Sequence, residues 1–163
     1  MPEEFSLPAN RNLEKLTEHQ VELVNRLFGA FEPGAVTLEW ENEYGARSFF
    51  EPRTDEYGQE YGVIRLGPDI FPGKSVGNPN AVLDVYGAVA HEIEHFYRWQ
   101  SGYELPAGWH RDLDEALTSL QAVCRQQGQL TKPQLVQLVS DALHRLTQHV
   151  ELLKAAEADS EAD

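Results

Sequence analysis

The chain has 163 residues, of which 41% are hydrophobic, so it is long enough to form one domain with a real core. Its 27 acidic and 13 basic residues give a net charge of −14, and the basic residues are scattered along the chain. Proteins that bind nucleic acids neutralise phosphates with clustered Lys and Arg, so we expect no direct binding of DNA or RNA. An acidic surface favours basic protein partners through long-range attraction, although the charge would also serve solubility alone.

The sequence contains no apolar run that approaches the roughly 18 residues of a membrane span. Residues 1–12 hold no basic cluster followed by an apolar stretch, so they do not resemble a secretory signal. Cys124 is the single cysteine, which excludes a disulfide within the chain. These features predict a cytoplasmic protein that makes no contact with membranes.

The first predicted element is a helix over residues 17–31. Thr17 and Gln20 have the spacing of a capping box, and apolar residues recur along one side of the helix. Three predicted strands follow, over residues 36–41, 46–51 and 61–66, with a turn at residues 43–45.

Three more helices are predicted in the second half of the chain. The first runs from about Asn78, as its N-cap, to about Gln100, and the second covers about residues 112–127. The last begins at Thr131, where Thr131 and Gln134 again have capping-box spacing. The order of elements indicates an α+β domain over residues 1–154, and the acidic residues 155–163 are predicted to be a disordered tail.

The long helix that ends near Gln100 contains the pattern His91-Glu92-x-x-His95. At about 100° per residue, the two histidines lie one turn apart on the side opposite an apolar stripe. Two such imidazoles can bind one metal ion, and Glu92 can reach a metal-coordinated water without being a ligand. The pattern therefore predicts Zn²⁺ bound by His91 and His95. The alternative is a pair of exposed histidines on an amphipathic helix.

A catalytic zinc site takes three protein ligands and a water. The extended metzincin motif is excluded, because it requires Gly and His where the chain has Arg98 and Ser101. Glu115 is the favoured third ligand, since it follows His95 by twenty positions and shares its side of the next helix with small residues. The alternatives are Asp112, Asp114 and His110. Asp112 and Glu115 also have capping-box spacing.

His91-Glu92-x-x-His95, followed after nineteen residues by Glu115-Ala116, resembles the gluzincin metallopeptidases, whose third ligand is a helix-borne glutamate. The small size and the strands before the motif are most similar to the ImmA/IrrE-type peptidases and the minigluzincins. Glu94 stands where the ImmA/IrrE-type proteins usually have a small residue. The resemblance covers about residues 61–124 and implies a compact zincin-like fold with His91, His95 and Glu115 as zinc ligands.

The resemblance further implies an endopeptidase that hydrolyses a protein or peptide partner, and the net charge of −14 favours basic targets. Glu92 would act as catalytic general base on a zinc-bound water. A second group would stabilise the oxyanion, and the candidates are His110, Tyr103, Arg111 and His144. The substrate is expected to extend a sheet edge, for which residues 61–66 are the candidate strand.

Two other functions compatible with the motif are an interaction or regulatory module of zincin fold that does not cleave, and a metal-dependent hydrolase of a non-peptide amide. Glu92 favours an enzyme, because a binding-only site needs no general base. Outside the motif, Asp84 and His149 are predicted to be solvated surface residues.

Overall fold

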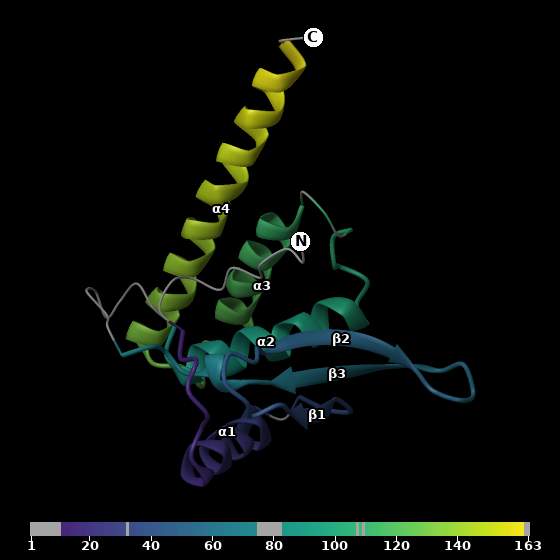
Figure 1. Cartoon of the computed structure of the whole chain (residues 1–163), viewed down its shortest axis with the longest axis vertical. Helices are drawn as coiled ribbons and strands as arrows, with labels where there is room; N and C mark the ends of the chain where they lie inside the picture. Colours follow the sequence, from purple (N-terminus) through teal and green to yellow (C-terminus); the bar gives the residue numbers. More distant parts are fainter. Residues whose placement is uncertain (1–10, 32, 75–82, 107, 109, 162–163) are drawn as a thin grey trace.

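A computed structural model of the protein describes residues 11–31, 33–74, 83–106, 108 and 110–161. Four α-helices accompany a three-stranded sheet and a short 3-10 turn over Pro68–Ile70 (Figure 1). The α+β class and the predicted order of elements are confirmed. Helix α2 lies at the centre and contacts α1, the sheet, α3 and α4.

Helix α1 spans Glu18–Phe31, and Thr17, the predicted first residue, lies directly before it. Its capping box is formed in both directions. The N–H of Thr17 donates to Gln20 Oε1 at 2.9 Å, and the N–H of Gln20 donates to Thr17 Oγ1 at 3.3 Å. Val24, Phe28 and Phe31 are buried on the side that joins the main core.

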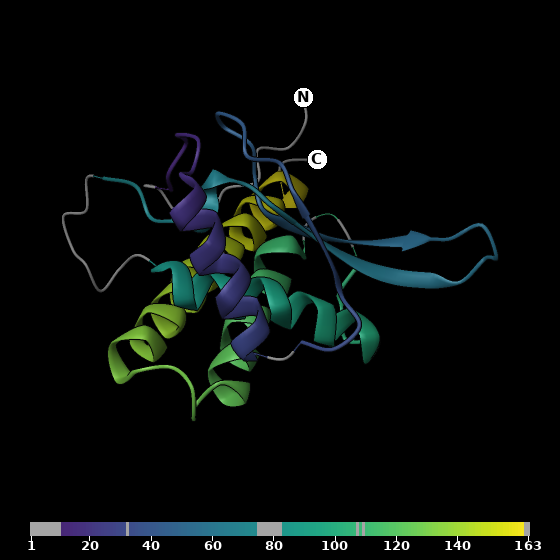
Figure 2. The ribbon, with the colours of Figure 1, turned by 90° about the horizontal axis from the view of Figure 1, so that it is seen from below.

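The sheet consists of β1 (Thr37–Trp40), β2 (Phe49–Thr54) and β3 (Glu60–Leu66) in the order β1-β3-β2. Strand β3 pairs with β2 in antiparallel and with β1 in parallel orientation. The prediction that residues 61–66 form a sheet edge was therefore wrong, because strands cover both sides of β3. In the view from below, the β2–β3 hairpin extends beyond the helices (Figure 2).

Strand β2 begins at Phe49, three residues later than predicted. The reason lies in the preceding residues, which pack on the loop after β3. The N–H of Ser48 donates to Asp69 Oδ1 at 2.7 Å, and its hydroxyl accepts from the N–H of Gly67 at 2.9 Å. These bonds take the backbone before Phe49 out of the sheet.

Helix α2 spans Val85–Gln100. The predicted N-cap, Asn78, lies outside the described residues, but residues 83–84 are not helical, so the predicted start was too early. Asp84 is the actual N-cap and accepts from the N–H of Gly87 at 2.9 Å, rather than being only solvated as predicted. The apolar stripe is buried as predicted at Val85, Val89, Ile93 and Phe96.

Helices α3 (Arg111–Arg125) and α4 (Lys132–Glu161) pack against each other on the other side of α2 from α1 and the sheet (Figure 1). The capping box predicted at Thr131 is present, with its N–H donating to Gln134 Oε1 at 2.9 Å. Residues 155–161, predicted to be disordered, continue α4, and residues 155–160 are exposed. Their Ala and Glu residues have high helix propensity, which composition alone does not separate from a tail.

Candidate metal centre

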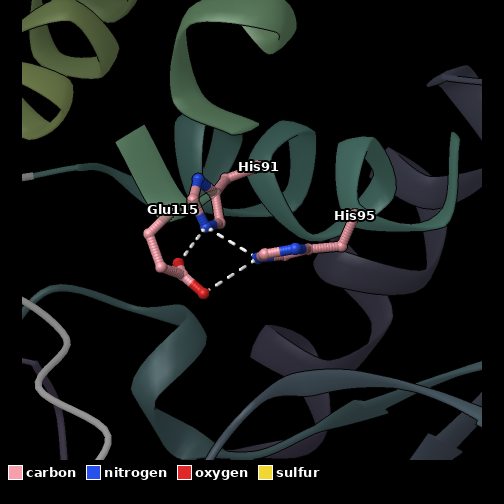
Figure 3. A group of neighbouring side chains, drawn as sticks. All are labelled: His91, His95 and Glu115. Carbon is pink, nitrogen blue, oxygen red and sulfur yellow. Dashed lines mark hydrogen bonds and ion pairs between the residues drawn. The ribbon is translucent and has the colours of Figure 1, made fainter. Parts of the chain in front are cut away.

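Three predicted ligands meet between α2 and α3. Nε2 of His91 lies 3.1 Å from Nε2 of His95 and 3.0 Å from Oε2 of Glu115 (Figure 3). The second oxygen of Glu115, Oε1, lies 3.4 Å from Nε2 of His95. The ligand atoms of the three residues all lie within 4.8 Å of one another, so the group could hold a metal ion.

The spacing of these atoms can be compared with that of a tetrahedral zinc site. With zinc–ligand bonds of about 2.0–2.1 Å, neighbouring ligand atoms are separated by about 3.3 Å. The separation of 3.1 Å between the two histidine Nε2 atoms is close to this value, and Glu115 approaches His91 and His95 with different oxygens, at 3.0 and 3.4 Å. Two histidines and one glutamate are also the ligands of zinc sites that keep a fourth position for water or substrate. The residues present therefore fit zinc.

The electrostatics of the group suit a cation. Burial opposes the charged form of His95, but the carboxylate of Glu115 raises the pKa of His95 to about 9. Burial alone would raise the pKa of Glu115, but His95 and His91 beside it hold that pKa well below its usual range. Glu115 is therefore a largely buried carboxylate that requires positive charge beside it.

Glu92 lies next to this group without belonging to it. Its side chain is buried, and burial raises its pKa against the opposing attraction of His95 and His91. Its Oε2 atom makes no hydrogen bond to the described residues. It lines a cavity of about 10 Å³ together with His91, which is close to the space of a single water molecule. His95 and Glu115 do not line this cavity, so what suits Glu92 to the role of a general base is its burial beside the ligand group and its oxygen that lacks a described partner.

A chain of hydrogen bonds that the sequence did not predict holds the Nδ1 side of the His91 ring. The hydroxyl of Ser119, on α3, donates to Asp141 Oδ2 at 2.5 Å and lies 2.8 Å from Nδ1 of His91. Because a hydroxyl has one hydrogen to donate, Ser119 accepts from the Nδ1–H of His91. This tautomer leaves the lone pair of Nε2 facing Glu115 and His95, as a metal ligand requires.

Arg145 extends the same network to the third ligand. Its Nε lies 3.2 Å from Asp141 Oδ2, and its Nη1 lies 3.7 Å from Glu115 Oε2. Both Asp141 and Arg145 are buried on α4. The sequence contained one signal of this network: Asp141 and Arg145 are an acidic and a basic residue at i, i+4, on the same side of the helix as the apolar Leu138.

The rival ligands are placed elsewhere. Asp114 pairs with Arg98 and accepts from the N–H of Leu105 at 3.0 Å. His110 is the N-cap residue of α3, and its side chain makes no capping hydrogen bond. Asp112 lies inside the first turn of α3, so the predicted capping box of Asp112 and Glu115 was wrong. Of the four carboxylate and imidazole candidates, Glu115 alone joins the two histidines in the described group.

Of the predicted oxyanion donors, Tyr103 and His144 lie at the surface. Tyr103 is 65% exposed and lines a separate pocket of about 300 Å³ with Arg98 and Cys124. His144 is exposed on α4. His149, predicted to be at the surface, is buried with its ring 6.5 Å from that of His110.

Glu94, the other acid of the motif, has a structural partner. It is buried, and Arg125 Nε donates to its Oε2 at 2.7 Å. The guanidinium of Arg125 also lies over the ring of Tyr97, 3.9 Å from the ring centroid. This ion pair joins α2 to α3, and both of its residues line the same pocket as Tyr103.

Comparisons of the chain with protein-family models, with curated proteins and with solved structures found no match. Within the described residues, no helix combines the length and the apolar character needed to cross a bilayer. The functional argument therefore rests on the geometry of the centre.

Proposed function

We propose that this protein is a zinc-dependent endopeptidase of the gluzincin type. His91, His95 and Glu115 would hold the zinc ion, and Glu92 would be the general base. The observation that carries the proposal is the convergence of one ligand atom from each of three residues, all within 4.8 Å of one another, beside a buried carboxylate with an oxygen that lacks a described partner.

Bound zinc would supply Lewis-acid polarisation of the scissile carbonyl and a lowered pKa for water. The chain's own residues supply the rest. Oε2 of Glu92 would take the proton from the attacking water and pass it to the leaving nitrogen. Burial, which raises the pKa of Glu92 in the metal-free centre, makes its carboxylate a stronger base.

Strand β2 is the sheet edge best placed for an extended peptide substrate. Among the described strands it pairs with β3 alone, and its Phe50 packs on α2 with ring centroids 6.2 Å from Phe96 and 5.7 Å from Trp99. A peptide added to this edge would run beside the helix that carries the two histidines. With a net charge of −14, basic segments are the favoured substrates.

Burial of the ligands favours a second candidate, an interaction or regulatory module that does not cleave. The side chains of His91, His95 and Glu115 are only 3%, 12% and 19% exposed. A zinc ion enclosed in this way would stabilise the packing of α2 on α3 without needing a substrate.

The Glu92→Gln variant separates the two candidates. Wild type, Glu92→Gln and the exposed control Glu22→Gln are loaded with zinc, assayed for metal content, and incubated with a peptide library rich in Lys and Arg. We expect equal zinc in all three proteins and a loss of cleavage of about 10²–10⁴-fold in Glu92→Gln alone. Equal cleavage by all three would exclude Glu92 as the base. A zinc-loaded wild type that cleaves no peptide would favour the module.

A further inference from the structure

Helix α4 carries an apolar stripe on the side that does not face the core. Its members are spaced 3, 4, 3, 4 and 3 residues apart, which is the a/d pattern of a coiled coil. They are Val136, Val139, Leu143, Leu146, Val150 and Leu153, and we call them the α4 stripe. Leu146 is half-buried, and the other five are between 37% and 60% exposed.

The α4 stripe is separate from the surface that α4 uses within the chain. The packed side of α4 is buried at Leu138, Ala142, Arg145 and His149. Residues 151–160 are all exposed, and the C-terminal part of α4 projects past α3 (Figure 1). A helical segment as short as residues 151–160 is marginally stable in water unless its apolar face is packed. The stripe continues onto this projection in an unchanged register, so one continuous partner surface would cover both parts.

We propose that the α4 stripe joins two copies of this chain as an antiparallel, two-fold symmetric helix pair. In the matching register, Val136 lies across from the partner's Leu153, Val139 from the partner's Val150, and Leu143 from the partner's Leu146. Each apolar position is thereby paired with another apolar position, as an isologous interface requires.

Charges at the two ends of the stripe determine the direction. The heptad continues to Lys132 at one end and to Glu157 at the other, and both residues are exposed. The antiparallel register places Lys132 across from the partner's Glu157, and symmetry repeats this pair at the other end. A parallel pair would set Glu157 against Glu157 and Lys132 against Lys132, which is repulsive.

The flanks of the stripe permit self-association of an acidic chain. On the open flank, the e positions Ser140 and Thr147 are not acidic, and the g positions Ala142 and His149 on the other flank belong to the packed side of α4. The seam covers 18 residues, or about 27 Å of helix. An interface of this length buries on the order of 1,000 Å² in total, which is the lower limit for a specific protein contact.

The first test is the oligomeric state of the full chain, measured by sedimentation equilibrium at concentrations up to about 100 μM, a range that includes weak interfaces of this size. We expect a concentration-dependent dimer for the wild type and a monomer for Leu143→Glu. Leu152→Glu is the matched control, because Leu152 is 44% exposed on the same helix but lies outside the stripe, and this variant should remain a dimer. A monomeric wild type, or a dimer that Leu143→Glu leaves intact, would overturn the proposal.

The second test is a charge reversal. Lys132→Glu and Glu157→Lys should each weaken the dimer about tenfold, because each creates two repulsive pairs across the two-fold axis. The double variant should recover the wild-type dissociation constant, since it restores both pairs with reversed sign. Both changes suit the helix dipole, so circular dichroism should show an unchanged fold. A double variant as weak as the single variants would overturn the antiparallel register.

Discussion

The hydroxyl of Ser119 lies 2.8 Å from Nδ1 of His91, on the side of the imidazole that faces away from the metal centre. Through its own donation to Asp141, Ser119 connects a proposed zinc ligand on α2 to the C-terminal helix. Metal-binding histidines are commonly oriented by a carboxylate or carbonyl on the second ring nitrogen. Here a serine stands between the imidazole and the carboxylate, so three helices hold one ligand in place.

Ser119→Ala should weaken zinc binding by about 10–100-fold, because His91 loses the acceptor that holds its tautomer. The affinity is measured by competition with a chromogenic chelator. Ser140→Ala makes the same chemical change one residue before Asp141 and should bind zinc as the wild type does. Equal affinities of Ser119→Ala and wild type would show that the hydrogen bond does not tune the centre.

Removal of the ligands themselves should abolish stoichiometric zinc. Elemental analysis of purified His95→Ala is expected to find little metal, whereas His144→Ala, an exposed histidine on α4, should retain it. Glu115→Gln should bind zinc more weakly than the wild type, whereas Asp112→Asn should bind zinc as the wild type does. Chelation of the wild type should lower its melting temperature, because zinc that binds only the folded state stabilises it. Equal zinc in the two histidine variants would contradict the assignment.

Gly62, on β3, packs against Phe96 of the helix that carries the metal centre. A Cβ atom at Gly62 would lie 2.6 Å from Cδ2 of Phe96 and 2.9 Å from Cε2 of Phe50. Gly62→Ala should therefore destabilise the protein by about 1–3 kcal/mol, measured by urea unfolding. Gly29→Ala is the control, because a Cβ at Gly29 meets nothing within 4 Å, and it should be neutral or stabilising. An unchanged midpoint for Gly62→Ala would mean that the aromatic rings move aside at little cost.

Asp69 should make stability depend on pH. Burial raises its pKa, although the hydrogen bond from Ser48 and the charge of Arg11 act in the opposite direction. The folded state thus binds this proton more tightly than the unfolded state, so the carboxyl favours folding at acidic pH and opposes it once the pH exceeds the raised pKa. Asp69→Asn should melt at a higher temperature than wild type at neutral pH, and the difference should shrink as the pH falls.

The comparison is made by thermal unfolding in a series of buffers from acidic to neutral pH. Asp55→Asn, at an exposed residue of the β2–β3 hairpin, is a control for a change of one charge at the surface. A lower melting temperature of Asp69→Asn at neutral pH would show that the charge of Asp69 beside Arg11 is worth more than its burial costs.

Features that depend on neighbouring residues were predictable from the sequence. The i, i+4 relation of His91 and His95 is a property of any helix, and both capping boxes, at Thr17 and Thr131, formed as predicted because their hydrogen bonds close within four residues. The predicted start of α2 was wrong because a local pattern does not distinguish Asn78 from Asp84, which are both suitable cap residues. Asp84 has a contact distant in sequence: Gln134 of α4 donates to its Oδ2 at 3.1 Å.

The sequence by itself determined the two histidines on one helix, the adjacent glutamate and the α+β order of elements, because each follows from the period of a helix or strand. Only the tertiary structure decided that Glu115 meets them and not Asp112 or Asp114, since a difference of one residue on α3 rotates a carboxylate by about 100° relative to α2. It also placed β3 in the centre of the sheet and buried Asp141 behind Ser119. These relations join residues far apart in the chain, and packing between elements sets them rather than any local pattern.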